Sequence, residues 1–381
     1  MNKTIFLTGA TGLVGGNLIS RVLTENPANS LVLLVRANSR EEAEGRVART
    51  LSLVSPNLSW ENARKRIQVV NGDVSLDKLG LNERDYAATA IATTHIIHSA
   101  AAVKFNNPLD LARKMNVVGT KNMITFAKKA QKLGDLHRFA YVSTAYVCGE
   151  REGTIVEDEL LPVAAFANSY EQAKHEAEAL VRLQMHELPI TVFRPSIIVG
   201  DSQSGRTTAF NVLYFPLRLI HRGLLKFLPG SRNTPADVVP VDYVSDALCH
   251  IFLTTEEGIG ETFHLTAGEK SVTSAGNVVD SAVEFFNKTG VEKEIPYIKF
   301  LPQQMVHLTK GLMSSSIQKA LRLMEVYESY LSIRRSFDNS NTRRVLRGTR
   351  ISPPPYSNYY RTILQYCLAC DWGKVAVQTA A

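Results

Sequence analysis

Cysteine is scarce in this sequence, with four residues among 381. That is too few for a disulfide framework and is typical of a reduced, cytoplasmic protein. Two of the four, Cys367 and Cys370, have the spacing of a metal or redox pair. No second Cys or His pair stands at zinc-site spacing, so we interpret them as ordinary thiols and predict no metal site.

Long uninterrupted apolar runs are also missing. The most apolar stretch, 210–228, is interrupted by four basic residues: Arg218, His221, Arg222 and Lys226. A membrane-spanning helix is therefore not expected there. The apolar N-terminal stretch is broken by Gly9, which disfavours a signal peptide. These features predict a soluble protein, and a peripheral contact with a membrane is left open.

The charge balance is only moderately basic, with 43 Lys and Arg against 36 Asp and Glu. No basic run is interleaved with aromatic residues, which disfavours a nucleic-acid partner. The excess suits phosphate-bearing ligands, an anionic protein or a membrane surface. Six arginines cluster late in the chain: Arg334, Arg335, Arg343, Arg344, Arg347 and Arg350. This cluster could bind an anionic partner; the alternative is that it is a solvated basic face or a nonspecific membrane-facing patch.

Short apolar runs alternate with segments of helical periodicity through the first half of the chain. The runs lie at 5–7, 31–35, 67–70, 95–97, 139–142 and 190–193. The clearest helical patterns lie at 13–25, 117–132 and 170–186. Continuous apolar runs of this length indicate strands that are buried on both faces. The pattern predicts an α/β fold with a Rossmann-type, doubly wound parallel sheet.

The character of the chain changes after Gly200. An amphipathic helix is expected at 210–228, and a helical pattern rich in Met and Leu follows at 303–330. One late strand, at 262–266, is expected to return to the sheet. We therefore predict a Rossmann domain of residues 1–200 with that returning strand, and an interleaved, mostly helical lobe of 201–261 and 267–381.

A glycine-rich turn follows the first expected strand and opens the first helix. Gly9 permits the tight turn, Gly12 lets the backbone approach a pyrophosphate, and Gly15 allows close packing of helix on strand. The free amides at the start of the helix then hold the phosphates. The other residues expected to contact a dinucleotide here are Thr11, Leu13 and Val14.

The residue after the second strand is Arg36, where an enzyme that uses NAD usually has Asp or Glu. A cation at this position favours NADPH, whose 2′-phosphate it can bind, and Arg46 or Arg40 is available to assist. After the third strand, Asp73 and Val74 are expected beside the adenine. A purely turn-forming role for Asp73 is equally plausible.

Tyr170 and Lys174 are four residues apart and therefore lie on one face of the expected helix. A neighbouring ammonium should lower the pKa of the phenol, so that Tyr170 can deliver a proton to a developing alkoxide. The strand that ends in Ser143 and Thr144 precedes this helix and supplies a hydroxyl for the substrate oxygen.

These elements, in this order, resemble the extended short-chain dehydrogenases/reductases over roughly the first two-thirds of the chain. Within that superfamily the sequence is most similar to the thioester reductase and fatty acyl-CoA reductase branch, which includes the reductase domains of carboxylic acid reductases. The local strings that carry this similarity are 34–37, the insert 38–66, 97–103, 116–120 and 194–200.

The resemblance implies a role for each matching position. Thr144 would orient the oxyanion, with Ser143 as a rival for that role. Tyr170 would be the acid, Lys174 the ribose anchor, and Asn116 a support for the active-site backbone. The remaining implied cofactor contacts are Ala100, Ala101 and Ala102 along the dinucleotide, with Pro195, Ser196 and Ile197 facing the nicotinamide.

The resemblance also implies an activity, the NADPH-dependent reduction of an acyl thioester to an aldehyde, with further reduction to the alcohol left open. The acyl group, expected to be fatty, would arrive on coenzyme A or an acyl carrier protein, and the arginine cluster suits either. The alternatives are an extended short-chain ketoreductase, a sterol dehydrogenase, a nucleotide-sugar epimerase, or a catalytically silent NADPH-binding regulator. Chain length and oligomeric state are not predicted.

Overall fold

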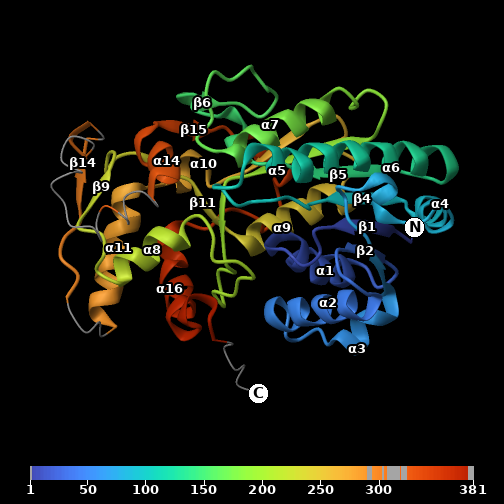
Figure 1. Cartoon of the computed structure of the whole chain (residues 1–381), viewed down its shortest axis with the longest axis horizontal. Coiled ribbons are helices and arrows are strands. Elements are labelled where there is room, and N and C mark those ends of the chain that lie inside the picture. The colour runs from blue at the N-terminus through green and yellow to red at the C-terminus, as the bar shows by residue number, and fades with distance from the viewer. Residues whose placement is uncertain (1, 290–293, 303, 307–317, 319–323, 376–381) are drawn as a thin grey trace.

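Seven strands form one parallel sheet in the order β12-β7-β5-β4-β1-β2-β3 (Figure 1). In this computed structural model, residues 2–289, 294–302, 304–306, 318 and 324–375 are described. The strands are β1 (Thr4–Thr8), β2 (Ser30–Val35), β3 (Ile67–Asn71), β4 (His95–His98), β5 (Arg138–Val142), β7 (Ile190–Pro195) and β12 (Thr262–Leu265). Ile5, Phe6 and Leu7 are fully buried because helices cover both faces. The predicted doubly wound parallel sheet is confirmed.

Two layers of helices enclose the sheet (Figure 1). The core of one face contains side chains from α1 (Leu13–Glu25), α2 (Arg40–Val54) and α9 (Val241–Cys249). The core of the other face contains side chains from α4 (Glu83–Ala92), α6 (Gly119–Leu133) and α7 (Ser169–Arg182). The predicted helix at 13–25 has the observed bounds, whereas the one predicted at 170–186 ends earlier, at Arg182.

The strand predicted at 262–266 does return to the sheet. β12 pairs in parallel with β7, with Thr262 opposite Val192 and Leu265 opposite Pro195. Helix α9, which the sequence division places in the second lobe, packs against α1 through the same core as the sheet. The two lobes therefore interleave more deeply than the sequence suggested.

The second lobe has its own apolar core, contributed mainly by α8 (Tyr214–His221), α11 (Ala275–Lys288) and α16 (Tyr360–Ala369). The helix predicted at 210–228 is wrong in extent: α8 is shorter, and β9 (Phe227–Pro229) follows it. Gly223, with a φ of +64°, turns the chain just after the helix and ends it. Most of the helix predicted at 303–330 lies outside the described residues; its end contains α14 (Glu328–Ser332).

The remaining described elements are short. Besides several 3-10 and π turns, the α-helices are α3 (Trp60–Ala63), α5 (Leu109–Arg113), α10 (Gly268–Ser271) and α15 (Ser340–Val345), and the strands are β6 (Gly153–Ile155), β8 (Ile197–Val199), β10 (Pro235–Ala236), β11 (Val238–Pro240), β13 (Thr273–Ser274), β14 (Lys299–Leu301) and β15 (Arg335–Phe337). Within the described ranges, no helix has both the length and the apolarity that crossing a bilayer requires.

Candidate active site

A cavity of about 450 Å³ opens where β1, β2, β4, β5 and β7 end. Ligands of doubly wound proteins bind at this edge of the sheet, because the carboxyl ends of the parallel strands meet there. The cavity brings together most of the predicted site residues: Gly9, Thr11, Gly12, Leu13, Val14, Arg36, Arg46, Asp73, Val74, Ala100, Ala101, Ser143, Thr144, Tyr170, Lys174, Pro195, Ser196 and Ile197. The other predicted site residues, Gly15, Ala102 and Asn116, are not among its lining residues.

The glycine turn fits a pyrophosphate. Gly9 has a φ of +76°, and a side chain there would place its Cβ 2.7 Å from the Ala100 nitrogen. A Cβ at Gly15 would lie 2.2 Å from the carbonyl oxygen of Gly9, so Gly15 serves the close packing of α1 on the turn. With no side chains in the way, the amides at the start of α1 are accessible to phosphate oxygens.

Two guanidinium groups lie at the end of β2. The Arg36 side chain is 66% exposed, and its Nη1 lies 3.6 Å from the Asp73 carboxylate. Arg46 donates to the Arg36 carbonyl oxygen and, at 3.3 Å, to the Thr11 hydroxyl. Asp73 also accepts a hydrogen bond from the Ser75 backbone at 2.8 Å, which is its turn-forming role. Arg40 pairs with Glu44 and is not a lining residue of the cavity.

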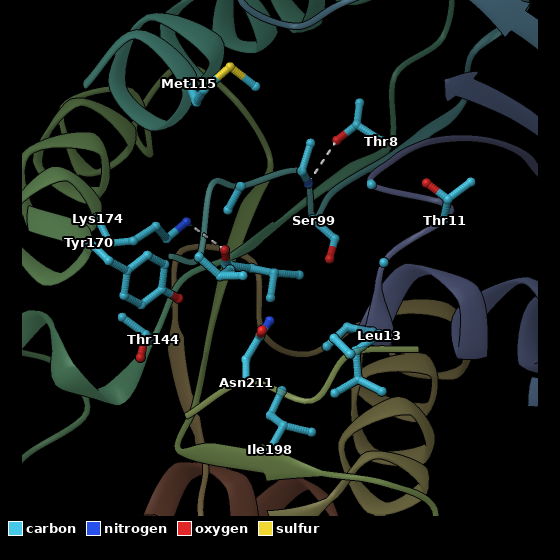
Figure 2. A pocket seen from close by; sticks show the side chains of 18 of the residues that line it. Thr8, Thr11, Leu13, Ser99, Met115, Thr144, Tyr170, Lys174, Ile198 and Asn211 are labelled. Atoms are coloured by element: carbon cyan, nitrogen blue, oxygen red, sulfur yellow. Dashed lines mark hydrogen bonds between the residues drawn. The ribbon is translucent and has the colours of Figure 1, made fainter. Parts of the chain in front are cut away.

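Tyr170, Lys174 and Thr144 gather at the far end of the cavity, as Figure 2 shows. The Lys174 ammonium donates to the Tyr141 hydroxyl and to the Val142 carbonyl oxygen, each at 2.8 Å. Burial lowers the pKa of Lys174 to about 7, while Glu178 acts in the opposite direction.

The expected lowering of the pKa of Tyr170 is wrong for this structure. Burial raises that pKa to about 12, and a hydrogen bond with the Thr144 side chain opposes the rise. The physical reason is that the Lys174 ammonium is turned toward Tyr141 and Val142. Tyr170 is thus a protonated phenol near neutral pH, which is the form a proton donor requires.

The two candidate strand-end hydroxyls have different surroundings. Ser143 donates to the Glu178 carboxylate at 2.5 Å, so its hydroxyl belongs to a buried ion pair of Glu178 with Arg194. Thr144 accepts a hydrogen bond from the Tyr146 backbone at 3.3 Å and lies beside the Tyr170 hydroxyl. The geometry therefore favours Thr144 over Ser143 as the group that meets the substrate oxygen.

Asn116 supports the wall of the cavity from behind. Its side chain accepts from the Ala102 nitrogen at 2.7 Å and donates to the Ala102 carbonyl oxygen at 3.2 Å. These two bonds fix the backbone that follows β4, which is the supporting role the resemblance implied.

A buried polar chain behind Lys174 was not anticipated from the sequence. The His98 ring lies 2.7 Å from the Thr8 hydroxyl and 3.3 Å from the Thr120 hydroxyl. Burial lowers the pKa of His98 to about 3, with a smaller contribution from Lys174, so the ring is neutral. Because neutral imidazole has one donor and one acceptor nitrogen, it can link β1 to α6 without a buried charge.

A second cavity, of about 70 Å³, adjoins the first. Its 18 described lining residues are all Tyr, Ile, Val, Leu, Pro, Ala or Met. Four of them line both cavities: Tyr146, Ile197, Val212 and Tyr330. Its walls come from α8 and from the end of the Met- and Leu-rich segment 303–330, both expected in the helical lobe, and from α11 and short strands that meet them only in the folded chain.

Tyr330 stands between the two cavities. Its hydroxyl donates to the buried Glu171 carboxylate and accepts from the Asn168 side chain at 3.3 Å. Its ring stacks on Phe105 with centroids 5.6 Å apart and 8° between the planes. Phe105 in turn stacks on Tyr170 at 5.9 Å. These contacts hold the C-terminal lobe against the first turn of α7, the helix that carries Tyr170 and Lys174.

The arginine cluster does not form a single binding patch. Arg335 is buried, donates to the Gly149 carbonyl oxygen and lies over the Tyr146 ring. Arg344 pairs with Glu257 and Glu261. Arg335 is therefore part of the core, whereas Arg344 is exposed but already paired, and the other four arginines are exposed.

The cysteine pair is buried. The Cys370 thiol approaches the Cys367 carbonyl oxygen at 3.6 Å, and both are free thiols. In the part of the chain that the structure describes, no group of three His, Cys, Asp or Glu side chains is placed to hold a metal ion.

The sheet, the glycine turn and the Tyr170 and Lys174 pair are those of an extended short-chain dehydrogenase/reductase, an oxidoreductase that binds NAD or NADP. Residues 7–248 match the model of the Male sterility protein family, and the chain belongs to that family.

The chain is similar to proteins of two kinds. The terminal R domain of the myxalamid polyketide and nonribosomal peptide pathway superposes with a TM-score of 0.81 at 27% identity, over 98% of this chain and 92% of that one. A probable fatty acyl-CoA reductase 5 of Arabidopsis thaliana is 24% identical over 90% of this chain and 88% of its own length. The nonribosomal peptide synthetase asaC of Aspergillus flavus is 28% identical over 90% of this chain, which spans 34% of that protein.

Proposed function

We propose that the chain uses NADPH to reduce the thioester carbonyl of an acyl group carried on coenzyme A or an acyl carrier protein. The observation that carries this proposal is the position of the Thr144 and Tyr170 hydroxyls. They lie together at one end of the cavity that fits a dinucleotide (Figure 2), and Tyr146 and Tyr330 line both this cavity and the apolar one. The R-domain and fatty acyl-CoA reductase relatives support the same substrate class.

Thr144 and Tyr170 would both donate hydrogen bonds to the carbonyl oxygen and stabilise the negative charge that develops on it. NADPH, when bound, supplies the hydride. Tyr170 would pass its proton to the oxygen, and Lys174 would hold the ribose of the cofactor. Hydride and proton together give a hemithioacetal. Its carbon–sulfur bond then breaks, the hydroxyl proton is lost and the leaving sulfur takes up a proton, so that one thioester, one hydride and one proton give one aldehyde and one thiol.

The assay that tests this proposal compares substrate classes. Purified protein with NADPH should oxidise the cofactor when given acyl-CoA or acyl carrier protein thioesters, and an aldehyde should be trapped as the product. Oxidation with a panel of ketones but with no thioester would replace the proposal with a ketoreductase. A nucleotide sugar is the weaker candidate, because the described walls of the second cavity hold no charged side chain that could bind its polar groups.

The cofactor preference gives a separate prediction. Arg36→Asp should weaken NADPH binding and leave NADH binding equal or stronger, because the substitution removes a cation from the expected 2′-phosphate site and adds a carboxylate. We expect the ratio of the two dissociation constants to shift by at least about tenfold, the equivalent of one charge-assisted hydrogen bond. Calorimetry with each cofactor measures it.

Arg40→Asp is the matched control, since Arg40 is also an exposed cation near the end of β2 but pairs with Glu44 instead. It should leave the ratio unchanged. Equal affinity of the unmodified protein for NADPH and NADH would contradict the proposed preference.

A further inference from the structure

The apolar cavity beyond Tyr330 is the strongest candidate for a site that the cofactor does not use. Its described walls carry no charged side chain, and the polar tip of Tyr330 is turned away into hydrogen bonds with Glu171 and Asn168. A ligand in a cavity of this composition buries apolar surface and forms few hydrogen bonds. A hydrocarbon group would therefore fit it best.

The cavity adjoins the reaction centre. Tyr146, two residues after Thr144, and Ile197, which follows Ser196, line both cavities. The substituent of a carbonyl carbon held beside Thr144 and Tyr170 would thus lie next to these shared walls. The volume of about 70 Å³ is roughly that of five water-sized spheres, which suits a short or compact apolar group.

We propose that this cavity binds the first carbons of the acyl chain, next to the thioester carbonyl, and that Tyr330 is the wall that positions them. This inference rests on the proposed function, because it names the substrate part that the same site recognises. Tyr330 is held rigidly by its stacking on Phe105 and by its bond to Glu171. A rigid wall of this kind discriminates between acyl groups by shape.

The cavity predicts how efficiency depends on chain length. From acetyl-CoA through butyryl-CoA to hexanoyl-CoA, kcat/KM should rise by up to about fourfold per added methylene, since each buried methylene contributes about 0.8 kcal/mol. Val279→Phe should remove this rise by filling the cavity from α11, so that kcat/KM no longer increases from acetyl-CoA to hexanoyl-CoA. Val279 is buried and lines the cavity.

Val283→Phe is the matched control. Val283 lies one turn further along α11, packs against the same core and is not a lining residue of the cavity. It should leave the length profile unchanged. If Val279→Phe does not fold, Ala236→Leu fills the cavity from β10 and carries the same expectation.

Hexanol binding, measured by calorimetry, separates this inference from the proposed function. If no thioester is reduced but hexanol binds the unmodified protein and not Val279→Phe, the thioester assignment fails and the apolar site stands. If thioesters are reduced with the same length profile in both proteins, or if hexanol binds both equally or neither, the cavity does not hold the acyl chain.

Discussion

Tyr170→Phe is expected to lower the rate of reduction by about 10²–10⁴-fold, the usual contribution of a positioned general acid. The affinity for NADPH should stay nearly unchanged, because only the phenolic oxygen is lost. A loss of turnover with unchanged NADPH affinity would show that the substitution impairs the chemical step and not the binding of the cofactor. Steady-state kinetics and calorimetry on the same sample measure the two quantities.

Two further variants test whether this loss of rate is specific to the Tyr170 hydroxyl. Tyr243→Phe removes the hydroxyl of another buried tyrosine, which lines neither cavity, and should leave the rate unchanged. Lys174→Ala should reduce both turnover and cofactor affinity, since its ammonium bonds the Val142 carbonyl at the strand end and is expected to hold the ribose. Full activity of Tyr170→Phe would refute the assigned acid and favour the silent NADPH-binding regulator.

Arg194→Met is expected to lower the free energy of unfolding by about 3–5 kcal/mol, because it leaves the Glu178 carboxylate buried without its main partner. The two side chains are 1% and 0% exposed, with 2.6 Å between Nη2 and Oε1. Arg194 also donates to the Glu159 carbonyl oxygen at 2.8 Å, so a second interaction is lost. Urea unfolding of the two proteins measures the difference.

The control for this prediction is Arg182→Met. Arg182 pairs with the same carboxylate at 2.9 Å but is 23% exposed, so its loss should cost about 1 kcal/mol. Replacing Glu178 and Arg194 together by apolar residues should recover part of the loss. Equal destabilisation by Arg182→Met and Arg194→Met would show that burial of the pair does not set its contribution.

The ion pair of Glu178 and Arg194 also makes the free energy of unfolding depend on pH. Burial raises the pKa of Glu178, but the two arginines and Ser143 more than offset this and lower it to about 2. Because the folded-state pKa lies below the ordinary value of 4.5, the stabilisation is complete above that value and is lost as the pH falls toward 2.

The sheet could be predicted because its strands are locally encoded. The run Ile5, Phe6 and Leu7 is apolar throughout and is followed at once by the glycine turn, so one short segment specifies both a buried strand and a ligand loop. The late strand β12 was predictable from a different local pattern, in which Phe263 and Leu265 alternate with polar residues. The length of helix α8 was overestimated. Gly223 ends the helix because its φ is positive, and the sequence alone does not show the φ of a glycine.

The site was predictable in composition but not in its hydrogen bonds. The spacing placed Tyr170 and Lys174 on one helix face. It could not show that the Lys174 ammonium turns toward Tyr141, which lies on strand β5. Nor could it show that Ser143 is held by Glu178. Such contacts join residues more than 30 positions apart, and only the packed sheet brings them together.

The place of β12 in the chain bears on how the protein is made. During synthesis β7 leaves the ribosome with one edge open, and its partner appears only after α8 and α9. The match to the Male sterility family ends at residue 248, before β12 begins. Until that late strand arrives, the edge of β7 is a template on which a second nascent chain can pair. We expect aggregation to compete with folding during this interval, before β12 covers the edge of β7.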